Sequence, residues 1–326
     1  MKQHAQVSRI EGERVIMNMQ NQRMIYGQTL VALGREDSRI VVLEADLGKS
    51  TMSCLFQQAF PERYFEMGIA EQNMVSFAAG LSLTGKVAFV NSFAVFAAGR
   101  PYDQIRQGVC IGKLNVKIAG SSSGLSDFGD GATHQAVEDI AIMRAIPNMT
   151  VLVPCDGIET RKMVSAAATH KGPVYIRISR GDLPDIISEQ MEFKIGKPYV
   201  IREGSDIAIF AMGIMVSEAL KAAKELEAEG ISARVVNVST LKPFDDKAIT
   251  ELAQDMKGIV TAEEHSIIGG LASAVTFALR GRPIPIEAVA IEDVFGQSAH
   301  DFNDLLTHYG LKDKNIVTKA KMVLKG

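Results

Sequence analysis

The sequence contains no tryptophan and only three cysteines, Cys54, Cys110 and Cys155, in 326 residues. These cysteines form no CxxC pair, and no cluster of cysteine and histidine has the spacing of a structural zinc site. The N-terminus is rich in polar residues and no long apolar run follows it, so we expect neither a signal peptide nor a membrane-spanning helix. These absences predict a cytoplasmic protein with reduced and mostly buried thiols.

An excess of charge of one sign is also missing. The chain has 35 Lys and Arg against 38 Asp and Glu, a net charge of −3, and the basic residues are dispersed. No basic stripe is available to bind nucleic acid or a membrane surface, so any phosphate recognition must be local. With 47% hydrophobic and 22% charged residues, the composition is that of a soluble globular protein long enough for two domains.

Short apolar runs alternate with helical patterns along the first part of the chain. Strands are predicted at 40–43, 86–92, 115–120, 150–154 and 174–178, and helices at 22–34, 93–111, 135–146 and 160–170. The run Ile40-Val41-Val42-Leu43 is apolar throughout, which is typical of a strand buried on both faces. The alternation predicts an α/β fold with a doubly wound parallel sheet.

A charged segment with several Pro and Gly residues interrupts this pattern, and the alternation then restarts. Further strands are predicted at 206–211, 233–238, 258–263 and 286–291, and helices at 215–229, 245–254, 270–279 and 301–309, before a basic C-terminal tail. We therefore expect an N-terminal arm (1–19), a first α/β domain (20–188), a linker (189–204) and a second, smaller α/β domain (205–326).

The stretch from Tyr64 to Gly80 places one carboxylate, Glu71, at the start of a largely apolar helix. The helix dipole favours an acid there, while apolar neighbours raise the cost of its charge, a combination suited to proton transfer. Taken alone, Glu71 is equally well explained as an ordinary solvated residue of a first helical turn. The neighbouring segments favour the functional interpretation.

Four polar loops follow predicted strands of the first domain: 46–50, 91–96, 127–135 and 179–182. In a parallel sheet all of them open towards one edge, where ligands bind. Each has an ordinary explanation when taken singly. Phe93 and Phe96 could be core residues, His134 a helix cap, Asp130 a turn former and Arg180 a surface ion pair.

Together these segments resemble, in order, motifs of the transketolase family of thiamine diphosphate enzymes. The matching motifs are Ile69-Ala70-Glu71-Gln72, Ser92-Phe93-Ala94-Val95-Phe96, Asp130-Gly131-Ala132-Thr133-His134-Gln135 and Ser179-Arg180-Gly181-Asp182-Leu183-Pro184. The resemblance covers nearly the whole chain, but only the C-terminal half of a transketolase. That half comprises a pyrimidine-binding domain followed by the transketolase C-terminal domain.

The resemblance implies a role for each residue on the cofactor side. Glu71 matches the glutamate that hydrogen-bonds the aminopyrimidine of thiamine diphosphate and promotes removal of the proton from the thiazolium carbon. Phe96 matches the aromatic residue that stacks on the pyrimidine, and Phe93 sits close by. Asp46 matches an acidic residue near the cofactor.

On the substrate side, Asp130 and His134 match residues that hydrogen-bond sugar hydroxyls, and His134 is expected to take part in catalysis as well. Arg23, Ser50 and Arg180 match the group that holds a sugar phosphate, a role suited to the forked guanidinium. Many transketolases carry a further histidine where this chain has Ser121-Ser122-Ser123. That difference leaves the donor sugar open.

The family holds the cofactor diphosphate through Mg²⁺ or Ca²⁺ bound by a Gly-Asp-Gly motif and a later Asn. The Gly-Asp-Gly of this chain, Gly129-Asp130-Gly131, belongs to the substrate motif and no suitably spaced Asn follows it. The resemblance therefore implies no metal on this chain. It implies an N-terminal partner subunit that binds the metal and diphosphate in an α2β2 heterotetramer, and transfer of a ketol unit from a ketose phosphate to an aldose phosphate in the pentose phosphate pathway.

Other interpretations stay open. The motifs also resemble 1-deoxyxylulose-5-phosphate synthase, although that enzyme is normally one long chain. The β subunit of a 2-oxoacid dehydrogenase has the right size, although its glutamate motif differs. Transketolases for sulfonated or branched sugars fit the three serines, and a non-catalytic scaffold subunit is the alternative from another class.

Overall fold

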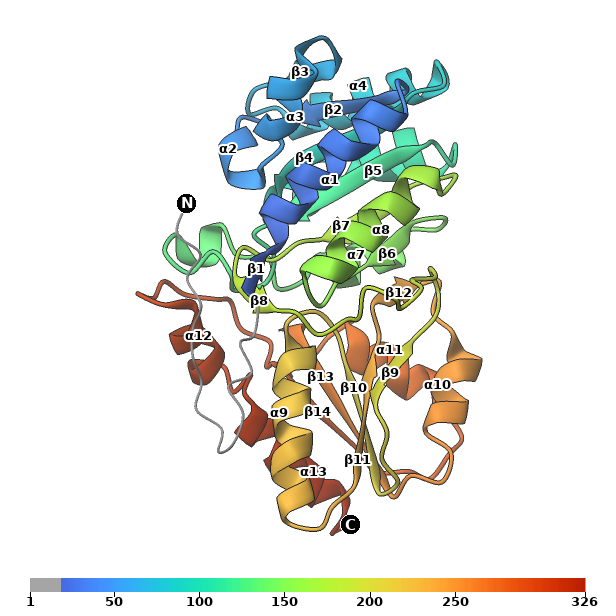
Figure 1. The fold of residues 1–326 in the computed structure, drawn as a ribbon, viewed down its shortest axis with the longest axis vertical. Helices are drawn as coiled ribbons and strands as arrows, with labels where there is room; N and C mark the ends of the chain where they lie inside the picture. The colour runs from blue at the N-terminus through green and yellow to red at the C-terminus, as the bar shows by residue number, and fades with distance from the viewer. Residues whose placement is uncertain (1–18, 326) are drawn as a thin grey trace.

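The computed structural model describes residues 19–325, and two open sheets lie one above the other along its long axis (Figure 1). Of the arm expected at 1–19, only Met19 falls within the described residues. Met19 begins β1 (Met19–Asn21), which pairs antiparallel with β8 (Asp182–Pro184). This small ribbon leads the chain into the first sheet from the side of the Ser179 to Pro184 motif.

The first sheet has seven strands, and its six strands from the first half of the chain run parallel. In spatial order they are β12 (Thr240–Lys242), β6 (Thr150–Leu152), β7 (Val174–Arg177), β5 (Val116–Ser121), β4 (Val87–Phe93), β2 (Ile40–Glu44) and β3 (Tyr64–Glu66). The edge strand β12 comes from the second half of the chain and pairs antiparallel with β6. All residues of β2 and β4 are buried, so the predicted doubly wound sheet is confirmed.

Helices cover both faces of this sheet. The helices α1 (Gln22–Glu36), α3 (Cys54–Ala59) and α8 (Gly157–Thr169) lie over one apolar cluster, and α4 (Glu71–Leu83), α5 (Ala94–Gly99) and α7 (Asp139–Ala145) over the other. Short helical turns complete the domain: α2 (Gly48–Thr51), η1 (Pro61–Arg63), α6 (Tyr102–Gln104), η2 (Ile105–Cys110) and η3 (Gly131–Thr133). Every one of the four polar loops follows a strand of this sheet, so they meet at its carboxyl edge.

Two helices expected from the sequence differ in the structure. The helix expected at 93–111 is broken at Pro101 into α5, α6 and the π-helical turn η2, because proline lacks the N–H that a continuous helix needs. The helix expected at 135–146 begins only at Asp139. Ala136 instead exchanges two backbone hydrogen bonds with Gly124, of 2.9 and 3.1 Å, which close the loop that carries the Asp-Gly-Ala-Thr-His motif.

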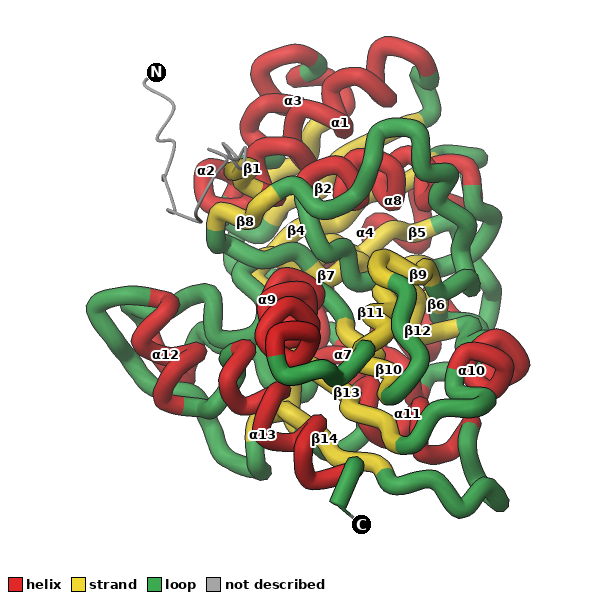
Figure 2. Tube along the Cα trace, turned by 60° about the horizontal axis from the view of Figure 1, so that its bottom comes forward, coloured by secondary structure: helices red, strands yellow, loops and turns green. Residues whose placement is uncertain are grey.

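The second sheet has five strands, of which four run parallel. Their order is β14 (Ile286–Ile291), β13 (Gly258–Ser266), β10 (Ile207–Ala211), β11 (Ala233–Asn237) and the antiparallel edge strand β9 (Tyr199–Arg202). The helices α9 (Met215–Ala228) and α13 (Asp313–Val323) lie on one side, and α10 (Asp246–Leu252) and α11 (Leu271–Ala278) on the other (Figure 2). The strand β9 falls within the expected linker 189–204, so only part of that range links the domains.

The expectation of a basic C-terminal tail was wrong, because residues 313–323 form the helix α13. Its buried residues, Ile316, Val317, Ala320 and Val323, follow the spacing of one helical face and pack against β13 and β14. The apolar pattern was present in the sequence but was masked by the lysines among which it lies. The helix α12 (Phe302–His308) precedes it and stands at the side of the second domain (Figure 2).

Buried polar side chains join the two domains. The carboxylate of Asp139 accepts hydrogen bonds from Arg177 Nε at 3.0 Å and from the Tyr175 hydroxyl at 2.7 Å. Arg177 also donates to the backbone carbonyl of Glu264 at 2.9 Å, and its Nη1 lies 3.8 Å from the Glu264 carboxylate. All four side chains are buried, so this network fixes β7 and α7 of the first domain to β13 of the second.

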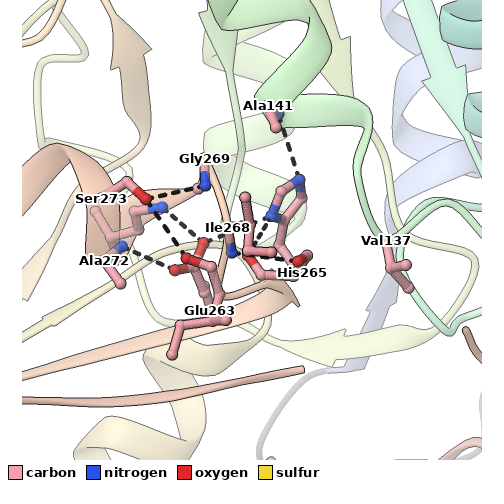
Figure 3. Close-up of polar contacts among 12 residues, drawn as sticks. Val137, Ala141, Glu263, His265, Ile268, Gly269, Ala272 and Ser273 are labelled. Carbon is pink, nitrogen blue, oxygen red and sulfur yellow. Dashed lines mark hydrogen bonds and ion pairs between the residues drawn. The ribbon is translucent and has the colours of Figure 1, made fainter. Parts of the chain in front are cut away.

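A second junction lies beside it (Figure 3). The His265 Nε2 accepts from Ala141 N at 3.4 Å, and Ser266 N donates to Val137 O at 2.7 Å. The Glu263 carboxylate accepts from Leu271 N at 2.6 Å and from Ala272 N at 2.8 Å at the start of α11. Burial raises the pKa of Glu263 and of Glu264 to about 7 and lowers that of His265 to about 4, so this interface disfavours charge on each.

The expectations for the thiols and for the membrane can be compared with the described part of the chain. Between residues 19 and 325 all three cysteines are free; Cys110 and Cys155 are buried and Cys54 is half-buried. None of the helices in that range combines the length and the apolar character needed to cross a bilayer.

Candidate active site

Glu71 is the first residue of α4, and only 4% of its surface is exposed. The chain reaches it through Gly68, which has φ +67°, a value that favours glycine, and through a tight turn in which Ala70 N donates to Gly68 O at 2.7 Å. The turn directs the side chain under the loop that precedes the helix. The charge of this carboxylate therefore lies at the positive end of the helix dipole and out of bulk water.

Arg100 is the partner of Glu71, and the sequence analysis missed it. The Arg100 Nη1 lies 2.7 Å from Glu71 Oε1, and its guanidinium carbon stands 4.0 Å from the centroid of the Phe96 ring. Arg100 is the residue at which α5 ends, directly before Pro101. One cation thus contacts both the buried carboxylate and the aromatic face.

A cavity of about 240 Å³ opens beside these residues. It is lined by Ala45, Asp46, Leu47, Ile69, Glu71, Phe96, Arg100 and His134. A second hollow of about 330 Å³ shares Ile69, Glu71 and Arg100 and continues along the start of α4. Four of the residues predicted for the site, Asp46, Glu71, Phe96 and His134, are therefore brought together at one cavity.

The aromatic residues form a wall of this cavity. The Phe93 and Phe96 rings are nearly parallel, 14° apart, with centroids separated by 6.1 Å. His134 meets Phe96 edge-on at 5.3 Å and Phe93 at 6.2 Å, and its Nδ1 lies 2.9 Å from the Thr133 hydroxyl. Phe93 is buried and stands behind Phe96, so Phe96 rather than Phe93 presents a ring to the cavity.

Two glutamates hold the loop that carries Asp46 and Ser50. The Glu66 carboxylate accepts from Asp46 N at 2.8 Å and from Gly68 N at 3.1 Å, which ties the ends of β2 and β3 together. The buried Glu44 accepts from the Thr51 hydroxyl at 2.7 Å, the Ser53 hydroxyl at 2.6 Å and Ala45 N at 3.0 Å. These bonds stabilise the non-glycine residue Asp46 at φ +61°.

The buried position of Glu44 predicts a dependence of stability on pH. Burial raises the pKa of Glu44 from 4.5 to about 7, so between these values the folded chain holds a proton that the unfolded chain has lost. Glu44 therefore contributes stability that is complete below about pH 4.5 and is lost as the pH rises through about 7. We expect Glu44→Gln to reduce the fall in the free energy of unfolding across this window, measured by denaturant titration at a series of pH values. The exposed Glu62→Gln is the control, and an unchanged slope in Glu44→Gln would contradict the assignment.

The residues predicted to hold a phosphate form a second group beside the cavity. Arg23 Nη1 donates to the backbone carbonyl of Ser50 at 2.8 Å, and Arg180 Nη1 lies 2.7 Å from Asp127 Oδ1. Burial, and then the positive charge of Arg180, lower the pKa of Arg23, so the two guanidinium groups share one electrostatic environment. Ser50 joins this group through its carbonyl rather than through the predicted hydroxyl contact.

Asp127 is the other residue of this group that the sequence analysis did not assign. Its side chain is buried and its second carboxylate oxygen, Oδ2, has no hydrogen-bond partner among the residues of 19–325. Desolvation raises the pKa of Asp127, while the charge of Arg180 opposes that rise. Asp130 lies on the same loop with an exposed side chain and also raises the pKa of Asp127 by its negative charge.

The three serines that replace the family histidine lie at the end of β5 and beyond it. All three are buried, and within the described part of the chain the hydroxyls of Ser121 and Ser122 have no hydrogen-bond partner. Ser122 has a left-handed backbone, with φ +51°. These serines do not line the two cavities at Glu71.

Similarity to known proteins extends over most of the chain. Residues 18–185 match the family model described as the transketolase pyrimidine-binding domain, and residues 196–316 match the transketolase C-terminal domain. A 6-deoxy-6-sulfo-D-fructose transketolase subunit of Clostridium sp. (strain MSTE9) is 43% identical, covering 92% of this chain and 94% of its own length. One of the two apulose-4-phosphate transketolase subunits of Phocaeicola vulgatus is 36% identical, covering 94% of this chain and 99% of its own length.

A solved structure is similar over the same extent. It is described as a split gene transketolase in an inactive β4 tetramer, and it superposes on this chain with a TM-score of 0.85 at 48% identity. The match covers 93% of this chain and 98% of that one. The similarity thus includes both sheets and the loops that meet at the carboxyl edge of the first.

Proposed function

This chain belongs to the transketolase family, in which it corresponds to the C-terminal half, and we propose that it is the C-terminal subunit of a split transketolase. In this proposal it transfers a ketol unit from a ketose phosphate to an aldose phosphate, together with a separate N-terminal subunit. The observation that carries the proposal is Glu71, a buried carboxylate at a helix start that opens into a cavity bounded by Phe96 and His134.

The cavity fits the pyrimidine end of thiamine diphosphate, the cofactor of the family. Phe96 is half-buried and presents an aromatic face, and Glu71 supplies a carboxylate beside it. When bound, the cofactor supplies a thiazolium carbon that becomes nucleophilic after loss of its proton. A planar, nitrogen-containing ring stacked on Phe96 matches the preference of aromatic pairs for offset or edge contacts.

Each residue of this chain then has a defined task. Glu71 holds and returns the proton at a ring nitrogen of the pyrimidine, for which its low exposure keeps competing water away. His134 hydrogen-bonds a sugar hydroxyl and moves protons there, and Asp46 and Asp130 bind from the neighbouring loops. Arg23 and Arg180 bind the phosphate as paired guanidinium forks.

The N-terminal subunit is proposed to bind the diphosphate through Mg²⁺ or Ca²⁺. In the described residues, no three His, Cys, Asp or Glu side chains come close enough to hold a metal. The surface next to Glu71 is apolar: Ile69, Phe77 and Leu83 are 74%, 42% and 74% exposed on α4 and the turn before it. Such a patch, continuous with the cavity, is suited to being covered by a second polypeptide, here in an α2β2 assembly.

Reconstitution tests this proposal. The purified chain is assayed with thiamine diphosphate, Mg²⁺ and sugar phosphates, with and without the N-terminal subunit encoded in the same genome. We expect turnover and saturable cofactor binding only when both subunits are present. Robust turnover by this chain alone would overturn the split assignment.

A transketolase for a sulfonated or branched sugar is the second candidate. Ser121, Ser122 and Ser123 replace a histidine expected at the donor, and two similar proteins are named for a sulfo-fructose and for apulose phosphate. The reconstituted complex should therefore be assayed with xylulose 5-phosphate, 6-deoxy-6-sulfo-D-fructose and apulose 4-phosphate. The donor with the highest kcat/KM decides between the two.

A further inference from the structure

A segment of the second domain lies against the loop that carries Asp130 and His134. We define the substrate loop as residues 124–136 and the clamp segment as residues 296–302, between β14 and α12. Ala299 N donates to Phe128 O at 2.8 Å, and the Gln135 side-chain amide donates to Gln297 O at 3.0 Å. In Figure 1 the chain around α12 lies next to the green loop that follows β5.

Gln135 is the centre of this contact. Its side chain is buried, and its Nε2 also lies within hydrogen-bonding distance of two carbonyls of the substrate loop, Asp127 O at 3.2 Å and Leu125 O at 3.4 Å. A Cβ placed on Gly296 would lie 1.7 Å from Gln135 Oε1. The backbone of the clamp segment therefore touches the side chain that holds the substrate loop together.

Close glycine contacts extend the interface to both substrate-binding loops. A Cβ on Gly131, which has φ +75°, would lie 2.4 Å from Ser298 Oγ. A Cβ on Gly181, beside Arg180, would lie 3.3 Å from the Phe302 ring. The clamp segment thus contacts the loop of Asp130 and His134 and also the loop of Arg180.

The base of the substrate loop is fixed independently by the second domain. Leu125 N donates to the buried Glu264 carboxylate at 2.7 Å, and a Cβ on Gly124 would lie 2.3 Å from the carboxyl carbon of Glu264. With its base held by β13 and its outer side by the clamp segment, the loop has little freedom to move away from Phe96.

We propose that the clamp segment positions the substrate loop, so that the C-terminal domain sets the affinity for the sugar substrate without touching the cofactor. The proposal rests on the function proposed above. The second domain is then a determinant of substrate binding: its residues 296–302 act through Gln135, Gly131 and Gly181 on the side chains that meet the sugar and its phosphate.

The test is Gly296→Ala in the reconstituted complex. The added methyl group must displace Gln135, and with it the loop of Asp130 and His134. We expect KM for the sugar substrates to rise by about tenfold or more, since small misplacements of binding groups have large effects. The affinity for thiamine diphosphate, measured by calorimetry, should stay within about twofold, because the Glu71 and Phe96 contacts are untouched.

Gly258→Ala is the matched control. Its Cβ would lie 2.5 Å from Val323 Cγ2, a comparable clash in the same domain but far from the substrate loop. We expect it to lower thermal stability with KM unchanged. Phe302→Ala is a second variant that introduces no clash, and it should raise KM through the Arg180 loop.

Amide hydrogen exchange of the isolated chain gives a reading independent of activity. We expect Gly296→Ala to accelerate exchange in residues 124–136 and Gly258→Ala to leave that segment protected. Accelerated exchange in a complex that lacks transketolase activity would refute the proposed function and retain the clamp. Unchanged KM and unchanged exchange in both Gly296→Ala and Phe302→Ala would overturn the clamp.

Discussion

Replacement of Glu71 by Gln is expected to lower kcat of the reconstituted complex by about a hundredfold or more, the scale of losing one acid–base group. Gln keeps the size of the side chain and a hydrogen-bond acceptor, but it cannot take up or return a proton. Because Arg100 Nη1 can still meet the side-chain oxygen that now lies 2.7 Å away, the cavity should keep its shape. Initial rates at saturating sugar substrate, with cofactor binding measured in parallel, check this.

The control for Glu71→Gln is Glu62→Gln, the same chemical change at an exposed residue of the short turn η1. We expect Glu62→Gln to keep the full turnover. A fall of less than about threefold in Glu71→Gln would be too small for a lost proton-transfer group and would favour the scaffold-subunit interpretation.

Replacement of Arg177 by Met is expected to lower the free energy of unfolding by about 3–5 kcal/mol at pH 8, as for other buried ion pairs that lose one partner. Asp139 and Glu264 would then face each other without the cation between them, in a region from which water is excluded. Denaturant titration followed by circular dichroism measures the change. The effect should be smaller at pH 6, where Glu264, whose pKa is raised to about 7 by burial, can bind a proton.

Arg161→Met is the control for Arg177→Met. Arg161 pairs with Glu189 at the surface, with both side chains about half exposed. Such pairs contribute about 1 kcal/mol or less, so this variant should retain nearly the whole stability. Equal losses in the two variants would show that the junction between the domains does not depend on the buried network.

The fold was predictable from the sequence because the strands are fully apolar and regularly spaced. The runs at β2 and β10 can be buried only between layers of helices, and this requirement dictates the parallel sheets. The π-helical turn after Pro101 was not predictable, because it depends on how η2 packs against α4 rather than on local periodicity. The strand β12 was missed because three residues carry too little pattern to distinguish a strand from a loop.

The site was predictable to the extent that it follows from strand ends. Asp46, Phe96 and His134 meet Glu71 because parallel strands deliver their loops to one edge. Arg100 was missed because its contact with Glu71 spans 29 residues and depends on the break in the helix at Pro101. Asp127 was missed because nothing in a Gly- and Asp-rich loop distinguishes a buried carboxylate from an exposed one.

The most direct measurement of the central claim is the rate of deuterium exchange at the thiazolium carbon of thiamine diphosphate. It is followed by quenched-flow NMR for the N-terminal subunit alone, for the complex with this chain and for the complex with Glu71→Gln. If Glu71 completes the site, exchange should be fast only in the complex with the unaltered chain and should fall to the rate of the N-terminal subunit alone in Glu71→Gln. Exchange that is equally fast in the complex with Glu71→Gln would contradict the account.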